Sequence, residues 1–374
     1  MNEPLISVVI PTHNRRALLE RALDDYEIQA GEGFRFEVVV VDDGSSDGTM
    51  ELLAARRPRE YALRFDHQNN AGPASARNRA LEMAAGELIV FAGDDIVPCR
   101  GFLSEHWRAH QQRPDRDVAI IGRTRWPQDL EVTATMRHVD GPGAQQFSFY
   151  YLVDGAEYDF RHFYTSNLSV KRGLLDLEPT HFSTDFHRAA FEDVELSYRL
   201  SLHGMRIHFL AAAQAFHYHP YDAGGFFQRQ RACGEMAAVL YEKYPALERW
   251  LGIRELDAER LQALYEPVTD WNRTARLSHR LGEMEGRALR VVGMFERSRE
   301  TPKEVDGLLA ALFRYAYLKG LAEIRYEDQP ARRLSARLYR KLLGPAAVAL
   351  VEGMSARNLP FPRSDVDAIL AHAA

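Results

Sequence analysis

The chain has 374 residues, of which 46% are hydrophobic and 27% charged, and 47 basic against 53 acidic side chains give a net charge of −6. This composition is typical of a folded globular protein and excludes a disordered chain, which has fewer apolar residues and a more one-sided charge. The mildly acidic balance gives no electrostatic basis for binding nucleic acid, so we expect no nucleic-acid partner.

Neither a sorting signal nor a membrane span is evident. The apolar run Leu5–Ile10 is too short for the core of a signal peptide, and no run reaches the ~18 apolar residues of a transmembrane helix. The two cysteines, Cys99 and Cys233, are too few for a disulfide framework, which favours a reducing compartment. We therefore expect a cytoplasmic protein, with attachment to the inner face of a membrane left open.

Strand and helix patterns alternate in the first part of the chain. Short apolar runs rich in β-branched residues predict buried strands at 6–10, 36–41, 61–65 and 87–91. Between these runs, apolar residues recur at helical spacing over 15–28, 48–56 and 74–85. Such alternation is typical of βαβ units, so we expect an α/β fold with a mostly parallel central sheet flanked by helices.

The middle of the chain is less regular, and helical patterns dominate after Pro220. We expect a loop-rich stretch over 130–157, a helix over 191–203 and short strands at 118–122, 206–209 and 214–216. Helical spacing then recurs over 226–244, 256–265, 273–297, 303–324 and 332–351. Because single cores rarely exceed about 250–300 residues, we predict an α/β domain over 1–222 and a helical C-terminal region over 223–374.

Polar segments follow three of the predicted strands. They are Pro11–Arg16 (PTHNRR), Asp42–Thr49 (DDGSSDGT) and Gly93–Asp95 (GDD). In open α/β sheets, ligands bind at the carboxyl ends of the strands, so these segments are candidates for a binding site. A glycine-rich dinucleotide fingerprint and a phosphate-binding P-loop are both missing from the sequence, which argues against a dehydrogenase or an ATPase.

Together these segments resemble family 2 glycosyltransferases, which have the GT-A fold. The similarity lies in SVVIPTHN (7–14), VVVVDDGSSDGT (38–49), NNAGPASARNRALEMAAG (69–86) and the segment 87–95. It continues with Phe191-Glu192-Asp193 before a helix and with a histidine at a later strand end, and it spans roughly 5–245. The resemblance implies an inverting, metal-assisted transfer from a nucleotide-sugar donor, with a UDP-sugar as the first expectation.

Asp94 and Asp95 are the predicted carboxylates of the metal site. A divalent cation held by carboxylates neutralises the donor diphosphate and acts as a Lewis acid. The resemblance implies that Asp95 is the main ligand of Mn²⁺ or Mg²⁺ and that Asp94 contacts the ribose or the metal. The alternative is an aspartate pair that only starts a turn. Many relatives have an acidic residue where this chain has Ala92, so its Asp-x-Asp pattern is incomplete.

The predicted nucleoside contacts lie at the ends of the first two strands. Asp43 stands where the family places a carboxylate against the base, and an ionised aspartate accepts a hydrogen bond from a ring N–H such as that of uracil. The alternative is helix capping, for which Asp47 is the better candidate. By resemblance, Pro11 and Thr12 approach the base and ribose through backbone atoms, and Asn14 orders the turn.

Three further residues are assigned by the resemblance. Arg77 is expected to face the diphosphate, and Asn167 falls where the family lines the sugar and acceptor pocket. Relatives often complete the metal coordination with a histidine, for which His217 fits the spacing better than His219. Isolated histidines are more often structural, which is the alternative reading.

Asp193 is the predicted catalytic base. Inverting transfer needs a carboxylate that accepts the proton of the acceptor hydroxyl as this attacks the anomeric carbon. Because Asp193 lies in the first turn of a predicted helix, the helix dipole is expected to favour its ionised form. The alternative is that Glu192, Asp193 and Glu195 only satisfy the helix terminus.

The acceptor is less constrained by the sequence. Gln228–Arg231 resembles the Gln-x-x-Arg-Trp signature of processive polysaccharide synthases, but Ala232 follows it, so transfer of a single sugar to a glycan, polysaccharide or lipid-linked glycan is favoured. Segment 331–351 is basic and amphipathic, which suits an anionic membrane surface, a homo-oligomer contact or simple packing through its leucines. The alternative functions are a polyprenyl-phosphate glycosyltransferase, a nucleotidyltransferase and a catalytically silent nucleotide-sugar-binding protein.

Overall fold

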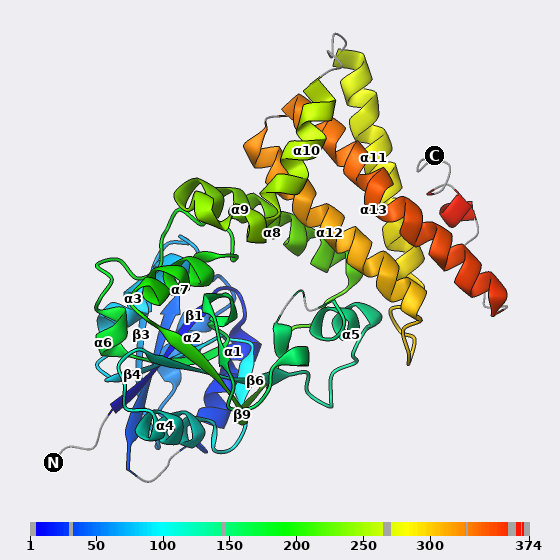
Figure 1. Cartoon of the computed structure of the whole chain (residues 1–374). Coiled ribbons are helices and arrows are strands. Elements are labelled where there is room, and N and C mark those ends of the chain that lie inside the picture. The colour runs from blue at the N-terminus through cyan, green and yellow to red at the C-terminus, as the bar shows by residue number, and fades with distance from the viewer. Residues whose placement is uncertain are drawn as a thin grey trace. The chain divides into compact units, whose positions relative to one another are not determined.

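The computed structural model describes residues 5–29, 33–143, 145, 147–264, 271–326, 328–357, 364–367 and 369. The chain divides into two compact units (Figure 1). The first comprises Met1–Glu131 and Phe147–His219, and the second comprises Val132–Gln146 and Pro220–Ala374. The sequence analysis had kept 132–146 in the first domain, whereas the structure assigns this segment to the second unit.

The first unit is built on a mixed sheet. Its strands are β1 (Leu5–Thr12), β2 (Arg35–Asp42), β3 (Ala62–His67), β4 (Leu88–Ala92), β5 (Ile96–Pro98), β6 (Val118–Arg125), β7 (Glu157–Tyr158), β8 (Asn167–Lys171) and β9 (Arg206–His217). They follow the order β3-β2-β1-β4-β8-β6-β9-β5, and β7 pairs with β9. The pairs formed by β1, β2, β3 and β4 are parallel, whereas β8 runs antiparallel to both of its neighbours.

Helices cover both faces of this sheet because the central strands are apolar on both sides. On β1, Val8 packs in one core with the helices α1 (Arg16–Tyr26) and α4 (Phe102–Gln112). The neighbouring Val9 packs in the opposite core with α3 (Pro73–Met83) and α7 (Glu192–Leu202). Successive side chains of a strand point to opposite faces, so this strand contributes to two cores at once. The short helices α2 (Thr49–Ala55) and α6 (Arg172–Leu175) complete the unit.

These features confirm the predicted fold class. The strand β9 differs from its prediction. The segments 206–209 and 214–216 were expected as two strands, but they belong to the single strand β9. The apparent break is a bulge, since Gly122 of β6 is opposite Leu210 and Arg123 is opposite Gln214. A bulge interrupts the alternation of side chains without ending the strand.

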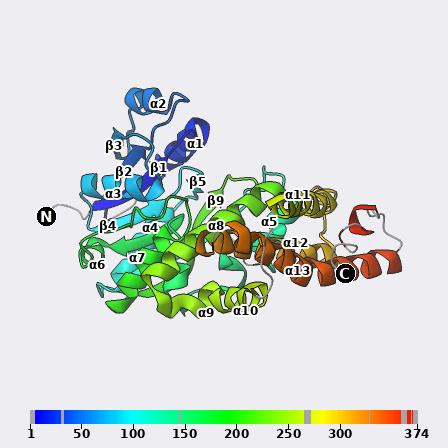
Figure 2. The ribbon, with the colours of Figure 1, turned by 90° about the horizontal axis from the view of Figure 1, so that it is seen from above.

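The second unit is helical, as predicted for the C-terminal region. It contains α5 (Ala134–Asp140), α8 (Ala223–Lys243), α9 (Glu248–Leu251), α10 (Ile253–Leu264), α11 (Trp271–Gly293), α12 (Lys303–Arg325) and α13 (Asp328–Ala356). Figure 2 shows α8, α12 and α13 side by side. A Cβ on Gly234 of α8 would lie 1.9 Å from the carbonyl oxygen of Tyr317, so glycine is required for the close approach of α8 and α12.

The basic helix α13 packs through its apolar side. Leu334, Leu338 and Leu343 are buried within the second unit, whereas Arg340 and Lys341 are exposed. Among the residues that the structure describes, no helix is long and apolar enough to cross a membrane.

Candidate active site

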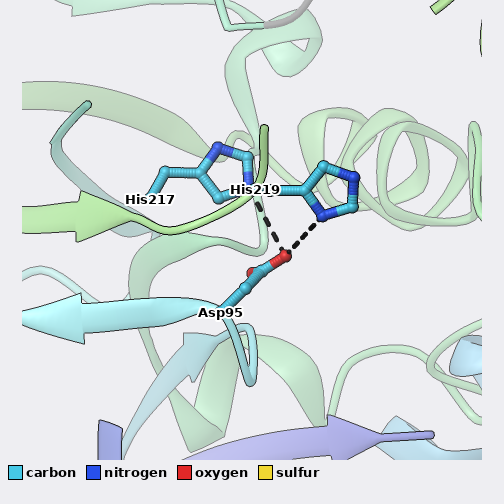
Figure 3. A group of neighbouring side chains, drawn as sticks. All are labelled: Asp95, His217 and His219. Atoms are coloured by element: carbon cyan, nitrogen blue, oxygen red, sulfur yellow. Dashed lines mark hydrogen bonds and ion pairs between the residues drawn. The ribbon is translucent and has the colours of Figure 1, made fainter. Parts of the chain in front are cut away.

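Asp95, His217 and His219 direct their ligand atoms toward one point (Figure 3). Asp95 directly precedes β5, and His217 ends β9, whose antiparallel pairing with β5 places Ile96 opposite His217. The Oδ2 atom of Asp95 lies 3.5 Å from His217 Nε2 and 3.1 Å from His219 Nδ1. One ligand atom from each residue lies within 4.8 Å of the others, so the group has the composition and spacing to hold a metal ion.

Asp94 belongs to the same cluster through Thr12 and Arg15. Thr12 Oγ1 donates a hydrogen bond of 2.8 Å to Asp94 Oδ2. Arg15 Nη1 lies 3.2 Å from Asp94 Oδ1 and 2.5 Å from Asp95 Oδ2, and its Nη2 lies 3.0 Å from His219 Nδ1. Arg15 was not predicted, although its place in the polar segment after the first strand was a signal.

The two carboxyl groups have opposite pKa shifts. Burial disfavours the charge of Asp95, but His217, His219 and Arg15 outweigh this effect and hold the pKa of Asp95 well below its usual value. Burial and the charge of Asp95 raise the pKa of Asp94 to about 6, against the opposing effect of Arg15. Asp95 is therefore ionised at neutral pH, and Asp94 takes up a proton in mildly acid solution.

The ring of His217 is fixed by aromatic neighbours. It stacks on Trp126, with ring centroids 5.1 Å apart and an interplanar angle of 15°, and Phe147 lies 5.7 Å away. His217 is the last residue of β9, and the ring of His219, two positions later, lies 5.6 Å from it at an interplanar angle of 27°. This geometry brings both histidines to Asp95, whereas the sequence analysis had preferred His217.

Asp43 holds the turn that leads into α3. Its Oδ1 accepts hydrogen bonds from Gln68 Nε2 at 2.7 Å and from the backbone N–H of Ala71 at 2.8 Å. Its Oδ2 accepts one from the backbone N–H of Gly72 at 2.9 Å. A nucleotide base at this carboxylate would share its oxygens with these donors.

Asn14 joins the segments that follow β1 and β2. Its Oδ1 accepts a hydrogen bond of 2.8 Å from the N–H of Ser46, and its own N–H donates one of 2.8 Å to Ser45 Oγ. The φ angle of Asn14 is 52°, a left-handed conformation that asparagine tolerates better than most residues. Pro11 and Thr12 are the last residues of β1, beside Val41 and Asp42 of β2.

Asp193 lies in the first turn of α7, next to a buried ion pair. Arg77 Nη1 donates a hydrogen bond of 2.8 Å to Glu192 Oε1, and both side chains are almost fully buried. Burial and the charge of Glu192 raise the pKa of Asp193 to about 7, against the opposing effects of Arg77 and the Val194 N–H. Burial of the side chain thus acts against the ionised form that the helix terminus is expected to favour.

Asn167 lies inside the sheet rather than on a pocket surface, which corrects its assignment to the sugar and acceptor pocket. Its side chain is fully buried, and its Oδ1 lies 2.9 Å from His106 Nε2. Its Nδ2 donates to the carbonyl oxygens of Ala213, in the bulge of β9, at 3.0 Å and of Arg123, in the facing strand β6, at 3.3 Å. These bonds give Asn167 a structural role in the strand that ends at His217.

Comparison with known proteins relates the first part of the chain to a family. Residues 7–176 match the family model described as Glycosyl transferase family 2. A validoxylamine A glucosyltransferase of Streptomyces hygroscopicus subsp. limoneus is 30% identical over 234 residues, which cover 54% of this chain and 49% of that protein. The chain spans about half the length of the first curated relatives that it matches.

Two further similarities are more limited. A GalNAc(5)-diNAcBac-PP-undecaprenol beta-1,3-glucosyltransferase of Campylobacter jejuni subsp. jejuni serotype O:2 is 34% identical over 103 residues, or 27% of this chain and 33% of that protein. A crystal structure of S. aureus TarS 1–349 in complex with UDP is 17% identical, with a TM-score of 0.48, and covers 88% of this chain and 92% of that chain. The segment that matches the family model contains Thr12, Asp43, Arg77 and the Asp94–Asp95 pair, and over this segment the chain is similar to family 2 glycosyltransferases.

Proposed function

We propose that the chain transfers a sugar from a nucleotide-sugar donor to an acceptor hydroxyl, with inversion at the anomeric carbon and with the help of a divalent metal. The main support is the group of Asp95, His217 and His219, with Asp94 beside it, together with the match of residues 7–176 to the family 2 glycosyltransferase model. Two carboxylates and two imidazoles at one sheet edge match the need to neutralise a diphosphate leaving group.

The side chains of the cluster suit Mn²⁺ or Mg²⁺. Asp95 is proposed as the main ligand, with His217, His219 and Asp94 as further ligands or contacts. Imidazole nitrogens beside carboxylates favour Mn²⁺, because Mg²⁺ prefers a shell made of oxygen alone. When bound, the ion would act as a Lewis acid on the donor diphosphate.

The nucleoside is proposed to bind at the ends of β1 and β2. Asp43 would accept the N–H of a base such as uracil, and Pro11 and Thr12 would line the base and ribose, beside the turn that Asn14 orders. Arg77 is proposed to lie near the diphosphate, in which case its guanidinium shares its donors between the phosphate and Glu192. A UDP-sugar is the first donor to test.

Asp193 is proposed to take the proton from the acceptor hydroxyl. A base is most effective when its pKa lies near the working pH, and burial with the adjacent Glu192 raises the pKa of Asp193 to about 7. Its neighbour Val194 donates a backbone hydrogen bond of 2.8 Å to Asp193 Oδ1, which orients the carboxylate.

The acceptor class has to be identified by testing a panel of acceptors, since the names of the two relatives specify different acceptors. A glycan, polysaccharide or lipid-linked glycan is proposed, and the exposed Arg340 and Lys341 would suit a contact with an anionic membrane surface. If a polyprenyl phosphate were the nucleophile instead, no strong base would be needed, and replacement of Asp193 would leave transfer largely intact.

The decisive experiment is a thermal-shift panel of nucleotide sugars and nucleoside diphosphates with Mn²⁺ or Mg²⁺, followed by transfer assays with the donor that binds. A ligand at about 100 times its dissociation constant stabilises by ~2.7 kcal/mol, which is readily measured. The absence of a shift with every nucleoside diphosphate would refute the proposal. Formation of product with retained anomeric configuration would refute the inverting mechanism alone.

A further inference from the structure

Arg15 places a permanent positive charge inside the candidate metal cluster. It is the residue just before α1, and its side chain reaches the carboxylates that follow β4. Asp94 and Asp95 are both buried, whereas the Arg15 side chain is 35% exposed. The guanidinium is therefore in contact with the buried carboxylates on one side and with solvent on the other.

The contacts of Arg15 involve the same atoms that a metal ion would require. Asp95 Oδ2 is the oxygen that faces His217 Nε2 and His219 Nδ1, and Arg15 Nη1 lies only 2.5 Å from it. The second guanidinium nitrogen, Nη2, lies 3.0 Å from His219 Nδ1. His219 Nδ1 also lies 3.1 Å from Asp95 Oδ2, so in either tautomer this nitrogen is engaged with Arg15 or Asp95 and must change partners to bind a metal.

A divalent ion and this guanidinium are like charges that need the same lone pairs. A metal at ordinary ligand distances from Asp95 Oδ2 would lie next to Arg15 Nη1, in a buried site where charges are weakly screened. We propose that Arg15 competes with the divalent metal and sets its affinity. The guanidinium must release Asp95 Oδ2 and His219 Nδ1 before these two atoms coordinate the ion together. This inference rests on the metal role assigned under the proposed function.

The opposing interpretation is that Arg15 only supports the cluster. In that case it keeps both carboxylates in place, and its loss would loosen the site and weaken metal binding. The two interpretations predict changes of opposite sign in the metal affinity. The direction of that change is therefore the deciding measurement, and it requires no transfer activity.

The test is a titration of the full, metal-free chain with Mn²⁺ alone, in which free Mn²⁺ is followed by electron paramagnetic resonance. Arg15→Gln removes the charge and keeps a polar side chain, and it should bind Mn²⁺ at least ~10-fold more tightly than the wild type. Arg16→Gln is the matched control. It makes the same charge change at the adjacent, exposed position and should leave the affinity within about twofold.

Thermal unfolding gives an independent reading of the same competition. Without metal, Arg15→Gln should melt below the wild type, because Asp94 and Asp95 lose their counter-ion. Added Mn²⁺ should then raise its melting temperature by more than that of the wild type. If Arg15→Gln does not fold, Arg15→Lys replaces it in the titration, since lysine keeps the positive charge but not the forked geometry of the guanidinium. The Arg15→Lys variant should bind Mn²⁺ at least ~3-fold more tightly than the wild type.

An equal or weaker affinity in the variant that folds would overturn the role of Arg15 and leave the metal site standing. Failure of the wild type and all variants to bind Mn²⁺ would overturn the competition and the metal in the proposed function together. The two failures are thus distinguishable within one set of titrations.

Discussion

The raised pKa of Asp193 has a consequence for stability that can be measured without knowledge of the substrates. The pKa of this carboxyl group rises from an ordinary value of 3.8 to about 7 in the folded chain. Between these values the unfolded chain has released the proton that the folded chain still holds. The wild type should therefore lose stability as the pH rises through this range and level off above pH 7.

The size of the effect follows from the shift. Each pKa unit corresponds to 1.36 kcal/mol. The expected loss from pH 5 to pH 8 is at most about 2–3 kcal/mol, and solvent that reaches the partly exposed Asp193 reduces it. Asp193→Asn removes this titration, so the variant should become more stable relative to the wild type as the pH rises.

The assay is urea unfolding of the wild type and Asp193→Asn at pH 5, 6.5 and 8 with a metal chelator present. The difference between the two proteins at each pH cancels the shared groups that do not interact with Asp193, including Asp94 with its own raised pKa. Arg77 and Glu192 stay in place in the variant, so the buried ion pair is retained. A difference that is constant from pH 5 to pH 8 would refute the inferred environment of Asp193.

Three further results are expected. Asp193→Asn should lower the rate of sugar transfer by at least ~10³-fold while the donor affinity stays nearly unchanged. The rate of the wild type should rise with pH up to about 7. Retained turnover in the variant would contradict the role of Asp193 as the base. His217→Ala should weaken Mn²⁺ binding by at least ~10-fold in a calorimetric titration, and an unchanged affinity would remove it from the ligands. Gly122→Ala should destabilise the protein by about 3 kcal/mol in chemical unfolding. The reason is that a Cβ at this position would lie 2.3 Å from the Ala213 carbonyl oxygen and 2.4 Å from Asn167 Oδ1. A neutral effect would contradict the tight packing at the bulge.

The sheet could be predicted where its strands are apolar on both faces. The expected strands at 6–10, 36–41 and 87–91 fall within β1, β2 and β4 apart from one residue at the last boundary, because helices bury both sides of them. The strand β8 was missed because buried polar residues interrupt its pattern. Ser169 at its centre contacts His106 and His110 of α4, which are themselves buried polar residues.

The position of a site residue could be predicted where a single polar motif directly follows a predicted strand. Asp95 and His217 stand at strand ends, so local sequence was sufficient to place them at the same edge of the sheet. Arg15 is different, because its place after the first strand marks it as polar but does not reveal its partners, which lie far along the chain. Asn167 was assigned to the pocket by resemblance alone, whereas its buried position depends on partners in other strands and in α4 that the sequence does not reveal.

Position 92, where this chain has alanine in place of an acidic residue, affects the total charge of the candidate metal cluster. Ala92 is buried in the core shared with α1 and α4, where a carboxylate would lose its hydration without a counter-ion. The cluster thus has two carboxylates and two histidines, with Arg15 offsetting part of the negative charge. A site with so little net negative charge should bind the cation more tightly when a ligand brings negative charge of its own, such as the phosphates of a nucleotide sugar.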